Sequence, residues 1–175
     1  MLAGELYRGD DPLLLSERRR CQQLLREANA ELDDDARFAL LSDLLGSLGE
    51  GTVIMPPLRC DYGYNIAVGA HTFVNYGAVI LDVAPVTIGE RVQIATNVQL
   101  LTADHPLDPV ARASGDELGR PIAVGAGAWL GGGAILCPGV SVGENSVIGA
   151  GSVVTRDIPA SVVAVGNPCR VLRVL

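Results

Sequence analysis

Residues 124–154 read VGAGAWLGGGAILCPGVSVGENSVIGAGSVV, and every sixth residue from Val124 onward is aliphatic. The same cycle covers Val68–Pro159, with lead positions at Val68, Val74, Ile80, Ile88, Ile94, Leu100, Val124, Leu130, Leu136, Val142, Ile148 and Val154. A period of six fits neither an α-helix nor an ordinary strand. Short hexapeptide repeats are instead typical of a parallel β-helix, in which each repeat forms one side of a coil. We therefore predict a mainly β fold, with the lead residues buried between neighbouring coils.

The other positions of the repeat suit a narrow coil with sharp corners. The residue four places after the lead is small or aliphatic at Thr72, Ala78, Ala84, Val92, Val98, Ala128, Ala134, Val140, Ser146 and Ser152. Glycine follows half of the lead residues, and it tolerates a positive φ at little cost. After His105 the cycle stops until Val124, and Pro106–Gly119 has no period. Because long structureless loops in compact domains are usually functional or disordered, we expect a projecting loop at about 106–120.

The segment before the repeat is predicted to be helical. Asp11 can cap a helix whose first residue is Pro12. A second helix should start near Asp33-Asp34-Asp35, where acidic residues complement the helix dipole, and end at Gly49 or Gly51. We expect residues 1–53 to form a helical hairpin that caps the open end of the β-helix, and residues 54–175 to form the β-helix, its loop and a C-terminal strand or tail.

Composition excludes several classes of protein. The chain has 175 residues and a net charge of −7, and all thirteen basic residues are Arg. An acidic protein of this kind is a poor candidate for nucleic-acid binding, and Arg18-Arg19-Arg20 is interpreted as a solvated helix face. No apolar run reaches the roughly 18 residues of a membrane span, and no secretory signal is recognisable. We expect a cytoplasmic protein whose four separated cysteines are reduced rather than paired or metal-bound.

Only two histidines are available for acid–base chemistry. His71 lies inside a regular coil, and we interpret it as a surface residue. His105 lies where the cycle breaks, and loops on rigid scaffolds are favoured places for reactive groups. Histidine is the side chain most often used as a general base in enzymes. No nucleophile elbow, P-loop or dinucleotide motif is present, and two histidines are too few for a catalytic zinc site.

Six segments carry a resemblance to a known family, and they occur in the same order along the whole chain. They are CDYGYNI at 60–66, FVNY at 73–76, VILD at 79–82, ADHPL at 103–107, WLGGG at 129–133 and GAGSVVTRDIP at 149–159. In these segments the chain closely resembles the maltose and galactoside O-acetyltransferases. That group belongs to the hexapeptide-repeat acyltransferases and also includes nodulation acetyltransferases.

The resemblance implies a left-handed parallel β-helix that forms a homotrimer, with active sites in the clefts between subunits. It implies that His105 removes a proton from a sugar hydroxyl, which then attacks acetyl-CoA directly without an acyl-enzyme. The backbone N–H of Gly132 aligns with the family's donor to the oxyanion. No metal is required.

The resemblance also assigns binding residues. Asn75 and Asp82 fall on the acceptor-site segment, with Asp61 and Phe73 lining the same pocket from one subunit. From the residues alone, Asn75 could instead be a left-handed corner residue and Asp82 could cap a turn. Binding of acetyl-CoA is expected from Trp129, Gly132, Ala150, Thr155, Arg156, Arg170 and Arg173, because an outward Trp is costly unless covered and arginines suit phosphates.

Three alternatives remain at this stage. The chain could acylate another hydroxylated small molecule or use another acyl donor. A γ-class carbonic anhydrase shares the fold, but its metal site needs three histidines. The chain could also be a non-catalytic trimeric scaffold, which would have no reason to require His105 at the break in the repeat.

Overall fold

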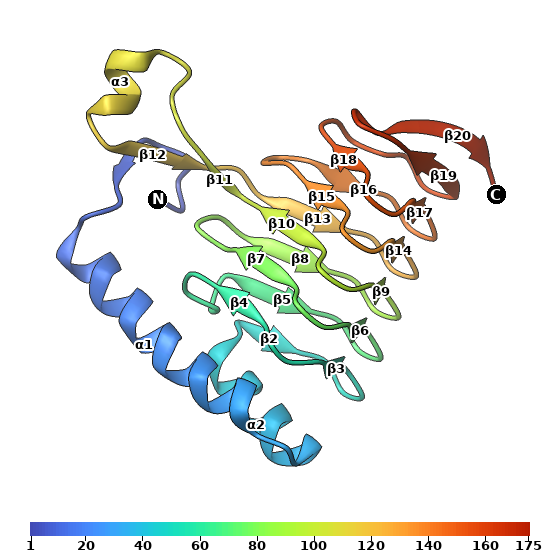
Figure 1. The fold of residues 1–175 in the computed structure, drawn as a ribbon, viewed down its shortest axis with the longest axis horizontal. Coiled ribbons are helices and arrows are strands. Elements are labelled where there is room, and N and C mark those ends of the chain that lie inside the picture. The colour runs from blue at the N-terminus through green and yellow to red at the C-terminus, as the bar shows by residue number, and fades with distance from the viewer.

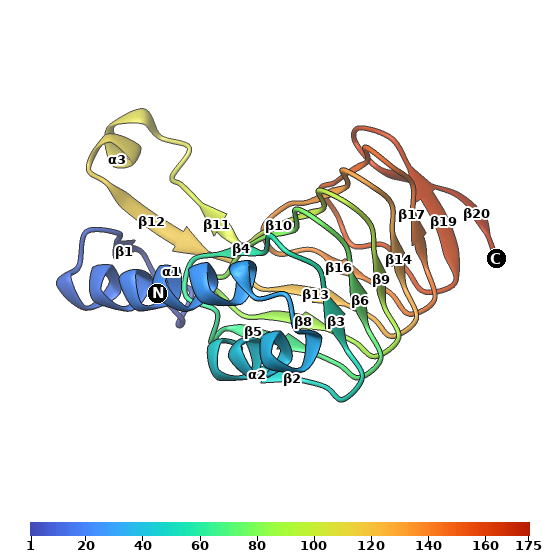
Figure 2. The ribbon, with the colours of Figure 1, turned by 60° about the horizontal axis from the view of Figure 1, so that its bottom comes forward.

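The computed structural model describes all 175 residues, most of which wind into a stack of coils with three flat sides (Figures 1 and 2). Face 1 contains the parallel strands β4 (Arg59–Cys60), β7 (Val79–Leu81), β10 (Gln99–Leu101), β15 (Ile135–Leu136) and β18 (Val153–Val154). Face 2 contains β2 (Ser47–Leu48), β5 (Ile66–Val68), β8 (Val86–Ile88), β13 (Ile122–Val124) and β16 (Ser141–Val142).

Face 3 contains β3 (Val53–Ile54), β6 (Phe73–Val74), β9 (Gln93–Ile94), β14 (Trp129–Leu130), β17 (Val147–Ile148), β19 (Val162–Val165) and β20 (Arg170–Val174). Only β20 runs antiparallel, against β19. The chain visits face 2, face 3 and face 1 in turn, for about six turns. The predicted parallel β-helix is therefore confirmed.

The lead residues of the repeat form the core, as predicted. All twelve are at most 3% exposed, and each lies directly above another lead residue, as in the column Ile80, Leu100 and Leu136. Burying one such aliphatic side chain contributes roughly 1.5–3 kcal/mol. A coil buries its lead residues only against its neighbours, so the stack is stable as a whole rather than coil by coil.

Small polar residues at the inner corners link one coil to the next. The hydroxyl of Thr72 donates to the carbonyl of Gly89 at 2.8 Å and accepts from the N–H of Val92 at 3.1 Å. Ser146 makes the equivalent bonds to Pro159 and Val162, at 2.7 and 3.2 Å. These buried hydroxyls are therefore satisfied, which is what a buried polar group needs.

Glycines at the corners allow neighbouring coils to approach closely. An ideal Cβ on Gly89 would lie 2.6 Å from the backbone nitrogen of Ala126 in the next coil. We expect Gly89→Ala to lower the free energy of unfolding by about 2 kcal/mol, because the coils would have to separate. Denaturant unfolding checks this against Gly132→Ala, whose Cβ would come no closer than 3.5 Å to Thr96. Equal losses in the two variants would contradict the close-packing explanation.

The helical hairpin covers the N-terminal end of the stack (Figure 2). Helix α1 (Pro12–Ala30) begins where predicted, with the Asp11 carboxylate accepting from the N–H of Leu13 at 2.8 Å. Helix α2 (Asp34–Leu44) also begins as predicted, but it ends before Gly49. The predicted end was wrong because β2 already pairs with β5, so the stack begins at Ser47 rather than at residue 54.

Side chains of α1 form hydrogen bonds with backbone groups at the open edge of the first coil. Asn29 donates to the carbonyl of Leu58 and accepts from its N–H, both at 2.9 Å. Gln22 donates to the carbonyl of Cys60 at 3.1 Å. These bonds occupy backbone groups that would otherwise be free to pair with another chain.

One segment leaves the stack between β10 and β13, and we call residues 103–119 the arm. The arm contains β11 (Ala103–Asp104), the short helix α3 (Pro109–Ala113) and β12 (Asp116–Gly119). Strand β12 pairs antiparallel with β11 and with β1 (Tyr7–Arg8) from the N-terminus. The arm projects from the stack (Figure 1), and it carries regular structure that the sequence did not suggest. None of the helices is both long and apolar enough to cross a membrane.

Candidate active site

The residues singled out from the sequence gather on two opposite edges of face 1. The links from face 1 to face 2, which we call the arm edge, hold Asp61, Asp82, His105, Thr155 and Arg156. The links from face 3 to face 1, which we call the glycine edge, hold Asn75, Gly132 and Ala150. Phe73 and Trp129 lie on face 3, and Arg170 and Arg173 lie on β20.

His105 is exposed at the base of the arm, directly after β11. Its backbone N–H donates to the Asp104 carboxylate at 2.9 Å, and its imidazole makes no hydrogen bond within the chain. Both ring nitrogens are therefore accessible to a ligand. An exposed imidazole on a paired strand end combines access with a fixed backbone, which suits a general base.

Asp61 lies on the same edge in a polar cluster that the sequence did not indicate. Arg18 from α1 places Nε 3.8 Å from the Asp61 carboxylate and donates through Nη2 to the Tyr62 hydroxyl at 3.0 Å. Burial raises the pKa of Asp61, and the charge of Arg18 acts in the opposite direction. Arg18 is half-buried, so its assignment to a solvated helix face was wrong.

Asp82 is fully buried, at 0% exposure, and does not face an open surface. Its Oδ1 accepts from the N–H groups of Asp61 and Tyr62, both at 2.9 Å, and its Oδ2 accepts from that of Asn65 at 3.3 Å. Burial raises the pKa of Asp82 above its usual value, although these N–H donors act in the opposite direction. The geometry fits the turn-capping alternative and leaves no oxygen free for a sugar, so the expected acceptor contact is not supported.

On the glycine edge, Asn75 is half-buried, and its side-chain oxygen accepts from the N–H of Tyr76 at 2.8 Å. It does not have a positive φ, so the left-handed corner interpretation was wrong for this residue; His71, with φ of 56°, does occupy such a corner. The N–H of Gly132 makes no hydrogen bond within the chain, whereas its carbonyl accepts from Gly151 at 2.9 Å. Ala150 is exposed beside it.

Aromatic side chains line the adjoining side of the stack. Phe73, Gln93 and Trp129 are register partners in successive coils of face 3, so their side chains point outward in one row. Trp129 is 53% exposed, an unusual cost for the only tryptophan of the chain. Thr155, Arg156, Arg170 and Arg173 are also exposed, towards the C-terminal end of the stack.

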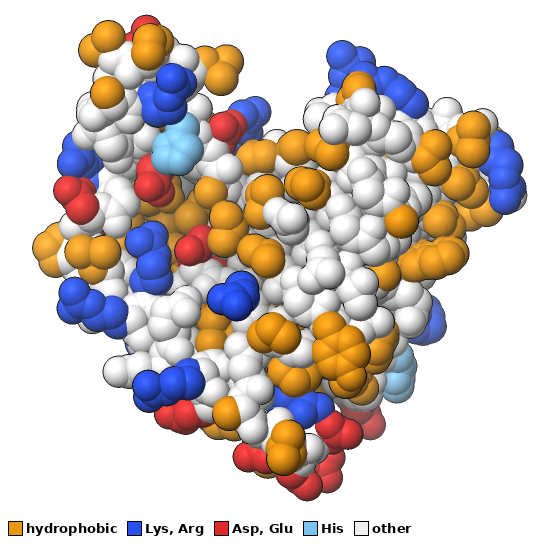
Figure 3. All heavy atoms as spheres, viewed as in Figure 1, with side chains coloured by type: hydrophobic (Ala, Val, Ile, Leu, Met, Phe, Trp, Pro, Cys, Tyr) orange, Lys and Arg blue, Asp and Glu red, His pale blue; other side chains and the backbone are white.

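One chain does not bring the two edges together. His105 and Asn75 lie on opposite sides of face 1, and Phe73 and Asp61 lie on different sides of the stack, so they do not line one pocket within one chain. The recess between the arm and the C-terminal coils is open to solvent and edged by apolar side chains (Figure 3). A site that used both edges would need a second chain to supply the missing half.

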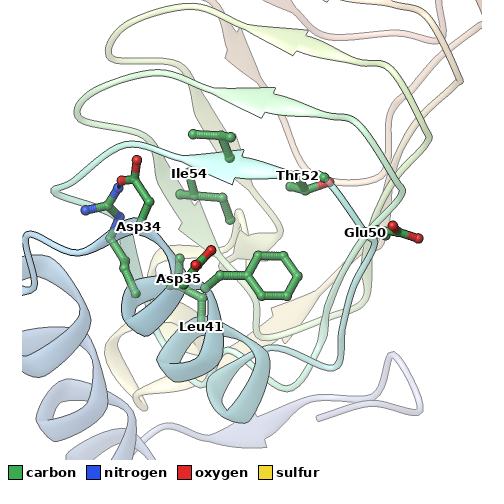
Figure 4. A pocket seen from close by; sticks show the side chains of 10 residues that line it. Asp34, Asp35, Leu41, Glu50, Thr52 and Ile54 are labelled. Carbon is green, nitrogen blue, oxygen red and sulfur yellow. Dashed lines mark hydrogen bonds and ion pairs between the residues drawn. The ribbon is translucent and has the colours of Figure 1, made fainter.

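Neither cavity of the single chain is lined by a residue that the sequence predicted for the site. The first, of about 330 Å³, lies between α2 and the first coil, with Asp35 and Leu41 on the helix side and Thr52 and Ile54 opposite (Figure 4). The second, of about 380 Å³, lies along α1 at Arg18, Arg19 and Gln22. No group of three or more His, Cys, Asp or Glu side chains is arranged to hold a metal ion.

Comparison with family models identifies both parts of the chain. Residues 1–49 match the maltose acetyltransferase hexapeptide capping motif, and residues 121–156 match the bacterial transferase hexapeptide repeat. Nodulation protein L of Rhizobium meliloti (strain 1021) is 49% identical over 173 residues, which cover 98% of this chain and 94% of that protein. Galactoside O-acetyltransferase of Escherichia coli (strain K12) is 39% identical, with 98% and 85% covered.

Solved structures give the same picture. A maltose O-acetyltransferase from Clostridium difficile 630 superposes with a TM-score of 0.97 and 48% identity, covering 99% of this chain and 94% of that one. A hexapeptide-repeat acetyltransferase from Vibrio cholerae O1 biovar eltor, solved in complex with acetyl coenzyme A, superposes with a TM-score of 0.95 and 38% identity, covering 100% and 96%.

Proposed function

Because the chain belongs to the maltose and galactoside O-acetyltransferase family, whose members are acetyl-CoA-dependent enzymes, we propose that it transfers the acetyl group to a hydroxyl of a sugar. Maltose, glucose and galactoside-like sugars are the acceptors we propose. The observation that carries the mechanism is His105, whose imidazole makes no hydrogen bond within the chain and lies at the longest interruption of the six-residue cycle.

In the proposed mechanism His105 accepts the proton of the sugar hydroxyl as its oxygen attacks the acetyl carbonyl carbon. The oxyanion that forms is stabilised by the N–H of Gly132, which has no partner within the chain. When the tetrahedral intermediate collapses, the carbon–sulfur bond breaks and the CoA thiolate takes the proton from the His105 imidazolium. No acyl-enzyme is formed, so no Ser or Cys nucleophile is needed.

We propose that the active unit is a homotrimer in which the arm edge of one subunit faces the glycine edge of the next. Asn75 then contacts the acceptor across from His105, and the outward Trp129 covers the pantetheine arm of acetyl-CoA. The arginines at the C-terminal end suit its phosphates. The free thiols of the four cysteines fit the reducing cytoplasm that we propose as its location.

Mixed trimers test the shared site. His105→Ala and Asn75→Ala chains should each be inactive alone, yet a heterotrimer of the two contains one cleft with both native residues. After unfolding and refolding of an equal mixture, we expect about a quarter of the parent activity, because roughly three trimers in four are mixed and each has one active cleft of three. No recovery in mixed trimers that mass spectrometry shows to be present would contradict a site between subunits.

The acceptor is tested by thiol release from acetyl-CoA with glucose, maltose, β-galactosides and chitin oligomers, against a control without acceptor. Turnover with at least one sugar supports the proposal. Turnover confined to a hydroxylated compound that is not a sugar would replace the acceptor class. Absence of turnover with every hydroxylated compound, in a sample that is folded and trimeric, would favour a scaffold.

A further inference from the structure

The contacts around the base of the arm single out two residues next to His105. Asp104 ends β11, and Arg120 directly follows β12, the strand that pairs with β11. The Arg120 guanidinium forms an ion pair with Oδ2 of Asp104, while Oδ1 of the same carboxylate accepts the N–H of His105 at 2.9 Å. The Asp104 carboxylate therefore connects the Arg120 side chain to the backbone of His105.

Arg120 is itself fixed to the stack. Its backbone N–H donates to the carbonyl of Thr102 at 2.9 Å, across the two strands of the arm. Its side chain passes over Gly139 of the next coil, where an added Cβ would lie 3.2 Å from the Arg120 Cβ. The backbone bond to Thr102 and the packing over Gly139 limit the positions of the Arg120 side chain, which can therefore hold the Asp104 carboxylate in one place.

The electrostatics agree with a persistent pair. Burial would raise the pKa of Asp104, but the hydrogen bond from Arg120 and the N–H of His105 more than offset it, and the pKa is lowered. The Asp104 side chain is 27% exposed and the Arg120 side chain is 56% exposed, so solvent partly screens this ion pair.

We propose that Asp104 and Arg120 are positioning residues that fix the backbone at His105, and thereby the direction of its imidazole. This inference rests on the proposed role of His105 as general base. The imidazole makes no hydrogen bond within the chain, so the backbone at His105 sets the direction of the Cα–Cβ bond from which the ring extends. Misplacement of a catalytic group by about 1 Å can cost about a hundredfold in rate.

The central variant is Asp104→Ala, in the complete trimer. We expect kcat to fall by about 30-fold while the KM for acetyl-CoA stays within about twofold, because only the direction of the base changes. The kcat of Arg120→Ala should fall by a similar factor. The kcat of the double variant should be no lower than that of Asp104→Ala alone, because the two residues act through one ion pair. Arg120→Lys keeps the charge and should recover part of the loss.

Asp108→Ala serves as the matched control for a loosened arm. Asp108 caps α3 through the N–H of Ala111 at 2.8 Å, and it belongs to the same arm without touching Asp104 or Arg120. Its kcat should stay within about twofold of the parent. If Asp108→Ala lost as much kcat as Asp104→Ala, any loosening of the arm would lower activity, and the proposal of specific positioning residues would be overturned.

A readout independent of turnover comes from the imidazole signals in NMR spectra. The chain has only two histidines, so His71 provides an internal reference. In Asp104→Ala the ring signal of His105 should shift because its backbone is no longer fixed, while that of His71 stays in place.

An unchanged His105 ring signal together with unchanged kcat would overturn the positioning role. If His105→Ala itself kept full activity, the proposed function would fail instead, whatever the Asp104 and Arg120 variants do. The two failures are therefore distinguishable.

Discussion

Replacing His105 by alanine is expected to lower kcat for acetyl transfer by roughly 10³-fold, within the range measured for loss of a general base. The proposed mechanism gives the proton of the acceptor hydroxyl to His105 because the arm edge holds no other histidine. The measurement is steady-state thiol release at saturating acceptor and acetyl-CoA.

Stability should not change in the same variant. The His105 side chain is exposed and makes no hydrogen bond, so its removal should alter the free energy of unfolding by less than about 0.5 kcal/mol. His71→Ala is the control, because the only other histidine occupies an exposed corner far along the chain. Undiminished transfer by His105→Ala would end the proposal of a histidine base, and an equal loss in His71→Ala would trace both effects to the fold.

Replacing Asp82 by alanine is expected to lower the free energy of unfolding by about 3 kcal/mol, because several buried N–H groups lose their acceptor at once. In the link at residues 61–65, the Asp82 carboxylate accepts from the backbone N–H groups of Asp61, Tyr62 and Asn65. Denaturant unfolding measures the loss, and hydrogen exchange should show faster exchange at these three amides.

Asp157 provides the matched comparison on the same edge. It accepts from the N–H of Ser141 at 2.7 Å but is exposed, so water can replace it, and Asp157→Ala should cost less than about 1 kcal/mol. The outcome that would restore Asp82 to the acceptor site is normal stability of Asp82→Ala combined with a raised KM for the sugar.

The repetitive part of the fold was predictable because each residue of a β-helix repeat has one environment. A lead position such as Leu130 is inward in any coil, so an aliphatic residue at every sixth place specifies the core without knowledge of other contacts. The ends of the hairpin were less predictable. Gly49 was taken as a helix stop, whereas it lies at a corner against the backbone of Ala70, which only the pairing of β2 with β5 reveals.

Individual residues of the candidate site could be predicted from the sequence, but the contacts between them could not. His105 could be recognised because the cycle stops after it, and Trp129 could be recognised because it occupies an outward position of the repeat. No sequence pattern identifies Arg120, because its partner Asp104 lies 16 residues earlier and contacts it only through the pairing of β11 with β12. For the same reason the sequence left Asp82 open between a sugar contact and a turn cap. Its three donors belong to the preceding coil, and a linear pattern does not show which way a corner carboxylate turns.

The arm leaves the stack without disturbing the ladder on either side of it. Leu100 before it pairs with Ile80, and Val124 after it pairs with Ile88, in the same register as coils that have no insertion. The tip of the arm, residues 106–115, can therefore change in length at little cost, since lengthening a surface loop costs only about 0.6 kcal/mol per doubling of its length. Insertions at this tip should therefore leave the β-helix, the helical hairpin and the Asp104–Arg120 ion pair in place.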